Sequence, residues 1–360
     1  MFGHETSRPH QLRKINMIIS VIGLGKLGLC IACIFAEHFK VIGIDTNEKH
    51  INALISGTNP IKEKGLDLLF KDNRKNITFT NSFEDLGDIV FVIVPTPSIA
   101  DNTFTSAYVE SALQEIGTKK TVVIVSTVMP GETMRMQKKY PQLNLIYSPT
   151  FIALGSVIAD FICPDFILMG TDSKKDLENV SEIYKKACAG YSDITVLSTL
   201  EAEIAKLTLN CYVTAKITFA NQIGNLCYRL GITADNILKA VGQDSRIGNL
   251  YFKAGLGYGG PCFPRDNLAM IAFMKKMNAN PRLLQTVHSL NYEQIKEFVD
   301  RVIKLKPTTV GFEGISYKSG TDITEQSQLA KIKSILGNKG YRTIIGKGDV
   351  NVGWEGIKGE

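Results

Sequence analysis

The sequence predicts an α/β protein that contains a doubly wound parallel sheet, one long central helix and a smaller second α/β unit. Three observations support this fold class. Apolar runs of strand length alternate with helical stretches over residues 17–170. A helical pattern continues without a break from Leu200 to Leu230, and a strand–helix–strand pattern follows Pro307. We therefore expect two separate sheets that are connected by helices.

The first unit places a glycine-rich loop between a strand and a helix. An apolar, β-rich run covers residues 17–22, and the loop GLGKLG follows at 23–28. An apolar helical pattern extends to about Phe39, and a second apolar strand, 40–44, ends in Asp45. A GxGxxG loop is weak evidence alone, but in this strand–helix–strand context it is strong evidence for a Rossmann-type domain.

The glycines and the acidic residue indicate which ligand this unit binds. Gly23, Gly25 and Gly28 permit a tight turn, close approach of a pyrophosphate and close packing of the helix. The N-terminus of the helix that follows favours phosphates. Asp45 would accept hydrogen bonds from ribose hydroxyls and would repel a 2′-phosphate, which favours NAD over NADP. A core of this kind that binds no nucleotide is the alternative.

Two of the later strands end in turns that are candidates for the cofactor cleft. Pro95-Thr96-Pro97 follows one strand, and the turn at 126–131, which contains Thr127, follows the next. Ligands of such sheets bind beyond the carboxyl ends of the strands, so both turns are expected near the cofactor. The strands predicted in this part of the chain are 89–94, 121–126, 143–147 and 166–170.

The long helix predicted at 200–230 would span roughly 45 Å at the standard rise per residue. This length exceeds the needs of one small domain, so we expect a connecting or dimer-forming helix. Glu203, Lys206 and Asn210 lie at positions i, i+3 and i+7 and therefore share one face. That face either points into a site or is a solvated polar surface, and the spacing does not distinguish between the two.

The remaining chain predicts helices followed by a small second sheet. About fifty residues follow Pro307, which is few for an independent domain. We expect helices at 267–277, 281–305 and 328–336, strands at 308–314 and 341–345, and a loop at 320–322. The expected division is a disordered extension at 1–16, an NAD-binding domain at 17–199, a central helical and dimerisation domain at 200–306, and a partial C-terminal domain at 307–360.

Composition excludes several classes of protein. The hydrophobic fraction of 44% and the charged fraction of 21% are ordinary for a globular protein. No apolar run is long enough to span a membrane, and residues 1–16 lack the apolar core of a secretory signal. The net charge of +6 is scattered, unlike the basic stripe of a nucleic-acid binder. The five histidines show no metal-ligand spacing, so no metal site is expected.

The cysteines indicate a reducing compartment. Seven is an odd number, and the spacing is irregular, so we expect free thiols in the cytoplasm and no disulfide framework. Cys30 and Cys33 form a CxxC pair inside an apolar helical run, where packing is the better explanation than redox chemistry.

Cys262 differs from the other cysteines because of its surroundings. It lies in the stretch GGPCFPRD at 259–266, where glycines permit close approach of a ligand and prolines stiffen the turn. Asp266 follows four residues later. Such a thiol is either a nucleophile or a small apolar filler of a buried loop, and the NAD unit favours the first interpretation.

From about Met17 to Ser327 the chain resembles the UDP-glucose/GDP-mannose dehydrogenase family. The stretches GLGKLGL, VPTP and STVMPG resemble its cofactor loops, EAEIAKLTLNCYVTAKITFANQIGNLC its central helix, and YFKAGLGYGGPCFPRD its catalytic loop. DSRIG resembles the segment before its substrate loop, and ISYKSGTD resembles the entry to its C-terminal sugar-nucleotide domain. The resemblance implies an NAD-dependent, four-electron oxidation of a nucleotide-sugar alcohol to a uronic acid, with UDP-glucose or a UDP-N-acetylhexosamine as substrate, and a homodimer formed through the long helix.

The resemblance also implies roles for individual residues. Cys262 would form a thiohemiacetal and then a thioester, Lys206 and Asn210 would stabilise negative charge on oxygen, and Asp266 and Thr127 would position or activate water. The expected cofactor contacts are Gly23, Gly25, Lys26, Leu27, Gly28, Asp45, Pro95, Thr96 and Thr127. The expected substrate contacts are Thr150, Phe151, Lys206, Asn210, Arg246, Tyr251, Lys253, Gly257 and Lys318.

Three positions depart from the family pattern. Thr150 and Leu154 replace glutamates of the pattern PEFLREG, and Glu325 replaces an arginine of TDDxRES. The C-terminal part also provides less than the full second Rossmann-like domain of the family. These departures favour an alternative interpretation, in which the protein is a catalytically impaired relative that binds NAD or sugar nucleotides without full turnover. A two-electron 3-hydroxyacid dehydrogenase is a further alternative, but that reaction needs no loop cysteine.

Overall fold

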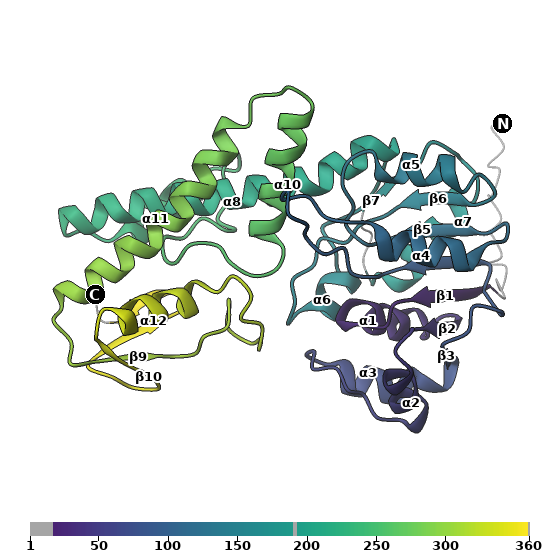
Figure 1. Ribbon diagram of the computed structural model, residues 1–360, viewed down its shortest axis with the longest axis horizontal. Coiled ribbons are helices and arrows are strands. Elements are labelled where there is room, and N and C mark those ends of the chain that lie inside the picture. Colours follow the sequence, from purple (N-terminus) through teal and green to yellow (C-terminus); the bar gives the residue numbers. More distant parts are fainter. Residues whose placement is uncertain (1–16, 190–192, 359–360) are drawn as a thin grey trace, which may run out of the picture.

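The computed structural model describes residues 17–189 and 193–358 (Figure 1), so the predicted disordered extension at 1–16 lies outside the described residues. The larger sheet has eight strands in the order β3-β2-β1-β4-β5-β6-β7-β8. All neighbouring strands are parallel except β6 and β7, which confirms a mostly parallel sheet. The strands are β1 (Ile18–Ile22), β2 (Lys40–Ile44), β3 (Ile77–Thr80), β4 (Ile89–Val92), β5 (Thr121–Ile124), β6 (Asn144–Tyr147), β7 (Phe166–Gly170) and β8 (Asp193–Leu197).

Helices cover both faces of this sheet, as expected for a doubly wound fold. Helices α1, α2, α3, α6 and α7 pack on one face, and α4 and α5 pack on the other. Helix α1 ends at Phe35 and not near Phe39 as predicted, because the chain turns at 36–38 before β2 begins. The helices are α1 (Lys26–Phe35), α2 (Glu48–Ser56), α3 (Leu66–Asn73), α4 (Ala107–Ile116), α5 (Glu132–Lys139), α6 (Val157–Ile162) and α7 (Leu177–Ala187).

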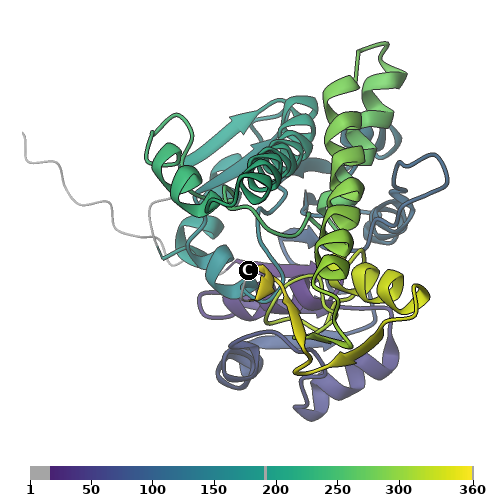
Figure 2. The same ribbon diagram turned by 90° about the vertical axis from the view of Figure 1, so that its left-hand side faces the viewer.

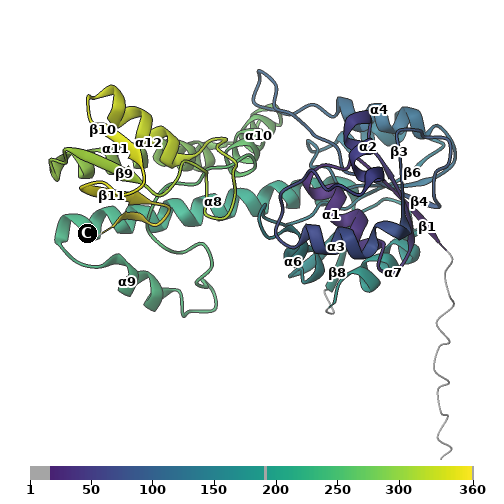
Figure 3. The same ribbon diagram turned by 90° about the horizontal axis from the view of Figure 1, so that it is seen from below.

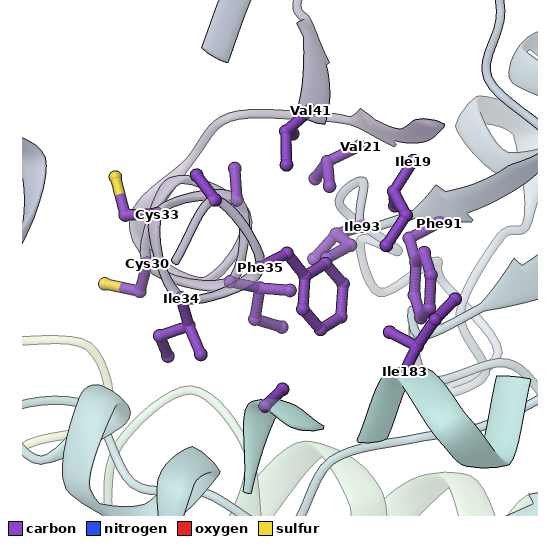
Figure 4. Close-up of a cluster of buried hydrophobic side chains, with 14 of the residues drawn as sticks. Ile19, Val21, Cys30, Cys33, Ile34, Phe35, Val41, Phe91, Ile93 and Ile183 are labelled. Carbon is purple, nitrogen blue, oxygen red and sulfur yellow. The ribbon is translucent and has the colours of Figure 1, made fainter. Parts of the chain in front are cut away.

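Helix α1 forms the centre of one hydrophobic core (Figure 4). The ring of Phe35 is fully buried, with its centroid 4.8 Å from that of Phe91 and 5.8 Å from that of Phe161. Cys30 and Cys33 are also fully buried, and burial raises the pKa of the Cys33 thiol to about 12. Both thiols therefore pack in the core, as the apolar sequence predicted.

Helix α8 (Thr199–Leu230) leaves the large sheet and extends into the other half of the molecule (Figures 1 and 3). Its start is fixed by a capping box in which the Ser198 side chain accepts from the Glu201 amide and the Glu201 carboxylate accepts from the Ser198 amide. Its end is fixed by Gly231, which adopts the left-handed conformation at φ 67°. The predicted helix 200–230 is therefore correct to within one residue.

Helices α9 (Ala234–Val241), α10 (Phe263–Lys276) and α11 (Arg282–Lys304) pack against α8 or against one another. Helix α10 begins at Phe263, four residues before the predicted start at Asn267. Pro264 lies in its first turn, where a missing N–H costs nothing. This correction matters because it places Cys262 directly at the N-terminus of a helix.

The second sheet has four strands in the order β10-β9-β11-β12 and packs against α11 and α12 (Figure 2). Its core contains Phe312 of β9, Leu329 of α12 and Phe298 of α11. The hairpin formed by β11 and β12 was not predicted, because its sequence is rich in glycine. The elements are β9 (Thr309–Phe312), α12 (Gln328–Asn338), β10 (Arg342–Ile345), β11 (Val350–Gly353) and β12 (Gly356–Lys358).

Substitution Phe35→Ala should lower the free energy of unfolding of the large-sheet part by about 3–5 kcal/mol, because it leaves a cavity between two other aromatic rings. Urea titration followed by circular dichroism measures this change. Leu68→Ala is the matched control, since Leu68 is 67% exposed on α3 and its truncation should change stability by less than about 0.5 kcal/mol. Equal effects of the two substitutions would contradict the packing described for Phe35.

Candidate functional site

A cavity of about 240 Å³ brings several predicted residues together. Its walls come from α8, from the loop that ends at Cys262, from the segment after β6 and from the loop after β9. The predicted residues that line it are Phe151, Lys206, Asn210, Tyr251, Cys262 and Lys318. Residues from both halves of the chain therefore form one chamber.

The polar face of α8 points inward. Glu203, Lys206 and Asn210 are all buried, so the alternative of a solvated polar face is wrong. The Lys206 ammonium donates to the carbonyl oxygen of Thr150 at 2.8 Å and lies 4.7 Å from the centroid of the Phe151 ring. Burial lowers the pKa of Lys206, while nearby Asp266 opposes this change.

Cys262 ends the glycine-rich loop and immediately precedes α10. Its side chain is exposed at the cavity wall. Gly260 adopts φ 81°, and a Cβ atom there would lie 2.6 Å from the ring of Tyr317, so this position requires glycine. The loop is thus packed closely against the segment that follows β9, and that contact fixes where the thiol lies.

Asp266 connects the cysteine helix to α8. Its carboxylate is fully buried and accepts from the Asn210 amide at 2.6 Å and from Nε of Arg265 at 2.9 Å. Arg265 also donates to the Thr96 carbonyl at 3.4 Å and stacks on Phe104 at 4.7 Å. The sequence reasoning missed Arg265, although its position beside Asp266 in the cysteine loop was a usable signal.

The charges around Cys262 act in opposite directions. Cys262 reaches solvent at the cavity wall, yet the protein packed around its sulfur is the main cause that raises the pKa of the thiol, and the Asp266 carboxylate adds to it. The cations of Arg265 and Lys206 lower that pKa. The N-terminus of α10 also favours a thiolate. The protonation state of Cys262 therefore depends on which of these charges are present.

The glycine-rich loop fits a dinucleotide. A Cβ atom at Gly28 would lie 1.8 Å from the Gly23 carbonyl oxygen, and one at Gly23, where φ is 90°, would lie 2.4 Å from the Ile93 oxygen. At Gly25 no heavy atom lies within 4 Å of the Cβ position, so this side of the loop is open for a pyrophosphate. Gly25 is also the residue before α1, and it provides no side-chain cap.

The side chains around this loop are held by hydrogen bonds and an ion pair. The Asp45 carboxylate, at the end of β2, accepts from the Leu24 amide at 2.8 Å and from the Asn47 amide at 2.9 Å. Lys26 pairs with Asp322 at 3.1 Å, which joins the loop to the segment after β9. Leu27 packs against the core of the large sheet.

Both predicted cofactor turns lie at the carboxyl ends of adjacent strands. Ser126 accepts from the Val94 amide at 2.9 Å and donates to the Val94 carbonyl at 2.8 Å, which ties the turn after β5 to the turn after β4. Thr96 is buried in one turn, Pro95 is exposed beside it, and Thr127 is half-buried in the other turn. The arrangement is that expected of a cofactor cleft.

Other predicted substrate residues lie outside the lining of this cavity. Arg246 is exposed and pairs with Asp244 at 2.7 Å, and Lys253 pairs with Glu355 at 3.5 Å. Gly257 packs against Asn291 of α11. Thr150 lines a smaller neighbouring cavity and contributes its carbonyl to Lys206.

Two negative findings apply to the described residues. Within 17–189 and 193–358, no cluster of His, Cys, Asp or Glu side chains could hold a metal ion. Over the same ranges, every helix is too short or too polar to cross a lipid bilayer.

Comparisons with known proteins agree with this geometry. Residues 17–188 match the model of the UDP-glucose/GDP-mannose dehydrogenase family, NAD binding domain, and residues 200–293 match the central domain of the same family. A UDP-glucose 6-dehydrogenase of Haloferax volcanii is 30% identical over 347 residues, covering 89% of this chain and 81% of the relative. A GDP-mannose 6-dehydrogenase of Pseudomonas aeruginosa is 29% identical over 355 residues, covering 91% and 80%.

Solved structures show the same fold. The structure of a UDP-glucose dehydrogenase from Pyrobaculum islandicum superposes with a TM-score of 0.85 at 30% identity, covering 94% of this chain and 83% of that one. These matches confirm the predicted fold and NAD as the cofactor, and they favour a nucleotide-sugar dehydrogenase over a hydroxyacid dehydrogenase. By sequence and by structure, the chain belongs to the UDP-glucose/GDP-mannose dehydrogenase family.

Proposed function

We propose that this protein oxidises the C6 alcohol of a nucleotide sugar to a carboxylate and passes through a thioester on Cys262. The substrate proposed is UDP-glucose or a UDP-N-acetylhexosamine. One observation carries the proposal: Cys262, Lys206 and Asn210 line the same cavity. All seven cysteines are free thiols, which fits action in the reducing cytoplasm.

The first oxidation converts the alcohol to an aldehyde. Each oxidation would consume one NAD, so the first NADH would leave and a second NAD would bind before the second hydride is transferred. Lys206 donates to the substrate oxygen as negative charge develops there, and Asn210 adds a second N–H while Asp266 holds its amide in place. The Asp266 carboxylate is fully buried and acts through Asn210, so Thr127 is proposed to position the water that takes up the proton. Lys318 and Tyr251 line the same cavity and are proposed to contact the substrate.

The second oxidation uses the thiol. The Cys262 thiolate attacks the aldehyde carbon, and the resulting thiohemiacetal loses a hydride to become a thioester. Water then cleaves the thioester, which releases the carboxylate and restores the thiol. In this scheme Lys206 stabilises the oxyanion in the attack and again in the hydrolysis.

A second candidate function follows from the hydrolysis step, because the residues near the thioester differ from those of the family pattern. Thr150 offers a carbonyl to Lys206 but no carboxylate, and Leu154 adds an apolar surface to the cavity. Among the described residues, the acidic lining of the cavity is Asp160, whose Oδ2 accepts from the Ala153 amide and the Ser156 hydroxyl. These contacts favour, as the second candidate, a protein that captures the aldehyde but releases the product slowly.

Purified protein given NAD and a panel of nucleotide sugars should form two NADH per sugar consumed, because both oxidations occur at one site. Absorbance at 340 nm with chromatography of the sugar product measures this ratio. Cys262→Ser should abolish uronic-acid formation, since the thioester can no longer form. No NADH with any sugar would contradict the proposed function.

A burst of NADH that stalls, with an adduct on Cys262 in mass spectrometry, would support the second candidate. In that case, the substitution Thr150→Glu tests whether the missing glutamate is the cause of slow hydrolysis. The substitution should raise turnover by about 10²-fold if a missing general base limits hydrolysis. Unchanged turnover would show that position 150 is not the bottleneck.

We also propose a homodimer formed through α8. Tyr212, Phe219 and Leu226 recur at seven-residue intervals on this helix and are 63%, 56% and 52% exposed. Residues seven apart lie on one face, so they form an apolar stripe along the helix. Leu230 extends the stripe, and it is 62% exposed. Exposed apolar residues gathered in this way are typical of an interface between subunits.

Phe219→Glu should convert the dimer to a monomer, because it places a charge in the middle of the apolar stripe. Analytical ultracentrifugation measures the change. Leu68→Glu is the control, since Leu68 is similarly exposed but lies on α3 at a distance from α8. A monomeric wild-type protein, or a dimer that tolerates Phe219→Glu, would refute this interface.

The rate of alkylation of Cys262 by iodoacetamide should rise with pH as the thiolate forms. Lys206→Met removes a cation that lowers the pKa of the thiol, so the midpoint of the pH profile should move up. Asp266→Asn removes a carboxylate that raises it, so the midpoint should move down. Cys262→Ser gives the background from exposed Cys163. Shifts in the same direction for both variants would contradict the assigned electrostatics.

A further inference from the structure

Glu203 is a buried carboxyl group that the chemistry proposed for Cys262 does not use. Its side chain is fully buried on α8, one turn before Lys206. Oε2 accepts from the Gly131 amide at 2.6 Å, and Oε1 accepts from the Thr133 amide at 2.8 Å. A carboxylate that gives up its water needs such donors, so both oxygens have a specific task.

The two Glu203 oxygens cap the start of α5. The residue before the helix is Gly131, at φ 95°, and it has no side chain with which to cap the first turn. The unpaired amides at a helix start normally bind a side-chain oxygen of the capping residue itself. Here Glu203 supplies both oxygens from a helix about seventy residues further along the chain.

The same contact fixes one end of the cofactor turn at 126–131. Ser126 holds the beginning of this turn by its two hydrogen bonds to Val94, and Glu203 holds the end at Gly131. Thr127 lies between these two fixed points. The position of Thr127 relative to α8 therefore depends on the Glu203 carboxylate.

Helix α8 also contacts the helix that begins directly after Cys262. On the same face of α8, Asn210 holds Asp266, which lies in the first turn of the helix that Cys262 precedes. Glu203 and Asn210 are two helical turns apart, so a rigid helix separates the cofactor turn from the cysteine helix by a fixed length. A hydride moves between groups only when they are held at close and defined separation.

We propose that Glu203 is a positioning residue that aligns the cofactor turn at 126–131 with the cavity of Cys262. This inference rests on the proposed function, because alignment matters only if a hydride passes between the two regions. Glu203 contacts neither substrate nor cofactor in this proposal and acts through the backbone of the turn.

Glu203→Gln tests the inference with little change in size. An amide has one acceptor oxygen, so one of the two backbone N–H groups loses its partner. We expect the Kd for NAD and the kcat for NADH formation to worsen by at least about tenfold, since small misplacements are costly in hydride transfer. The KM for the sugar should stay within about twofold, because Lys318 and Tyr251 are not held by Glu203.

Glu201→Gln is the matched control. Glu201 lies two residues earlier on α8 and also caps a helix start, but that start belongs to α8 itself and is exposed. This control should leave the Kd for NAD unchanged. A Glu203→Gln variant with a lower melting temperature but an unchanged Kd and kcat would reduce Glu203 to a structural residue and overturn the inference.

Glu203→Asp keeps the experiment informative if the glutamine variant does not fold. It retains the charge and both oxygens but withdraws them by one methylene, so the Kd for NAD and the kcat should again worsen together. Wild-type kinetics for folded Glu203→Asp would overturn the inference. NAD binding is measured by fluorescence quenching without sugar, so a failure of the proposed sugar oxidation is distinguishable from a failure of the role of Glu203.

Discussion

The buried polar face of α8 is the constraint on which the rest of the site depends. Glu203 binds the turn after β5, Lys206 binds the carbonyl of Thr150 after β6, and Asn210 binds Asp266 on α10. Because these side chains lie at i, i+3 and i+7, the helical repeat sets their separations. A shift of α8 along its axis would break all three contacts together, so the helix places three segments relative to one another.

The burial of these charges has a chemical result. Asp266 and Glu203 each accept two hydrogen bonds, which compensate their oxygens for the loss of water. Burial raises the pKa of Glu203, and its hydrogen bonds to Thr133 and Gly131 oppose that change. Within residues 17–189 and 193–358, the hydrogen-bond acceptor of the Lys206 amine is the neutral carbonyl of Thr150. Burial lowers the pKa of Lys206, and the protein packed around the sulfur raises the pKa of Cys262. The two carboxyl groups connect α8 to the turn after β5 and to α10, while Lys206 and Cys262 line the cavity.

The sequence predicted those elements correctly that depend on a single local pattern. The GxGxxG loop between strands and the unbroken helical run at 200–230 predicted the large sheet and α8 correctly. Local sequence patterns could not predict contacts between segments that are distant along the chain. No local pattern shows that Arg265 reaches the Thr96 carbonyl or that Glu203 caps α5, because those partners are separated by 169 and about seventy residues. The start of α10 was missed because Pro264 was taken as a loop residue.

The close contact between Gly260 and the ring of Tyr317 has a consequence for the order in which the molecule is built. Tyr317 follows β9, so one wall of the cavity is made from residues that are synthesised well after the large sheet. The large sheet and its glycine-rich loop lie within residues 17–197 and are synthesised first. N-terminal units generally fold first during synthesis, so the nucleotide-binding half acquires its shape before the cavity beside Cys262 has all of its walls. The loop of Cys262 therefore gains its contact with Tyr317 only after the large sheet has been synthesised.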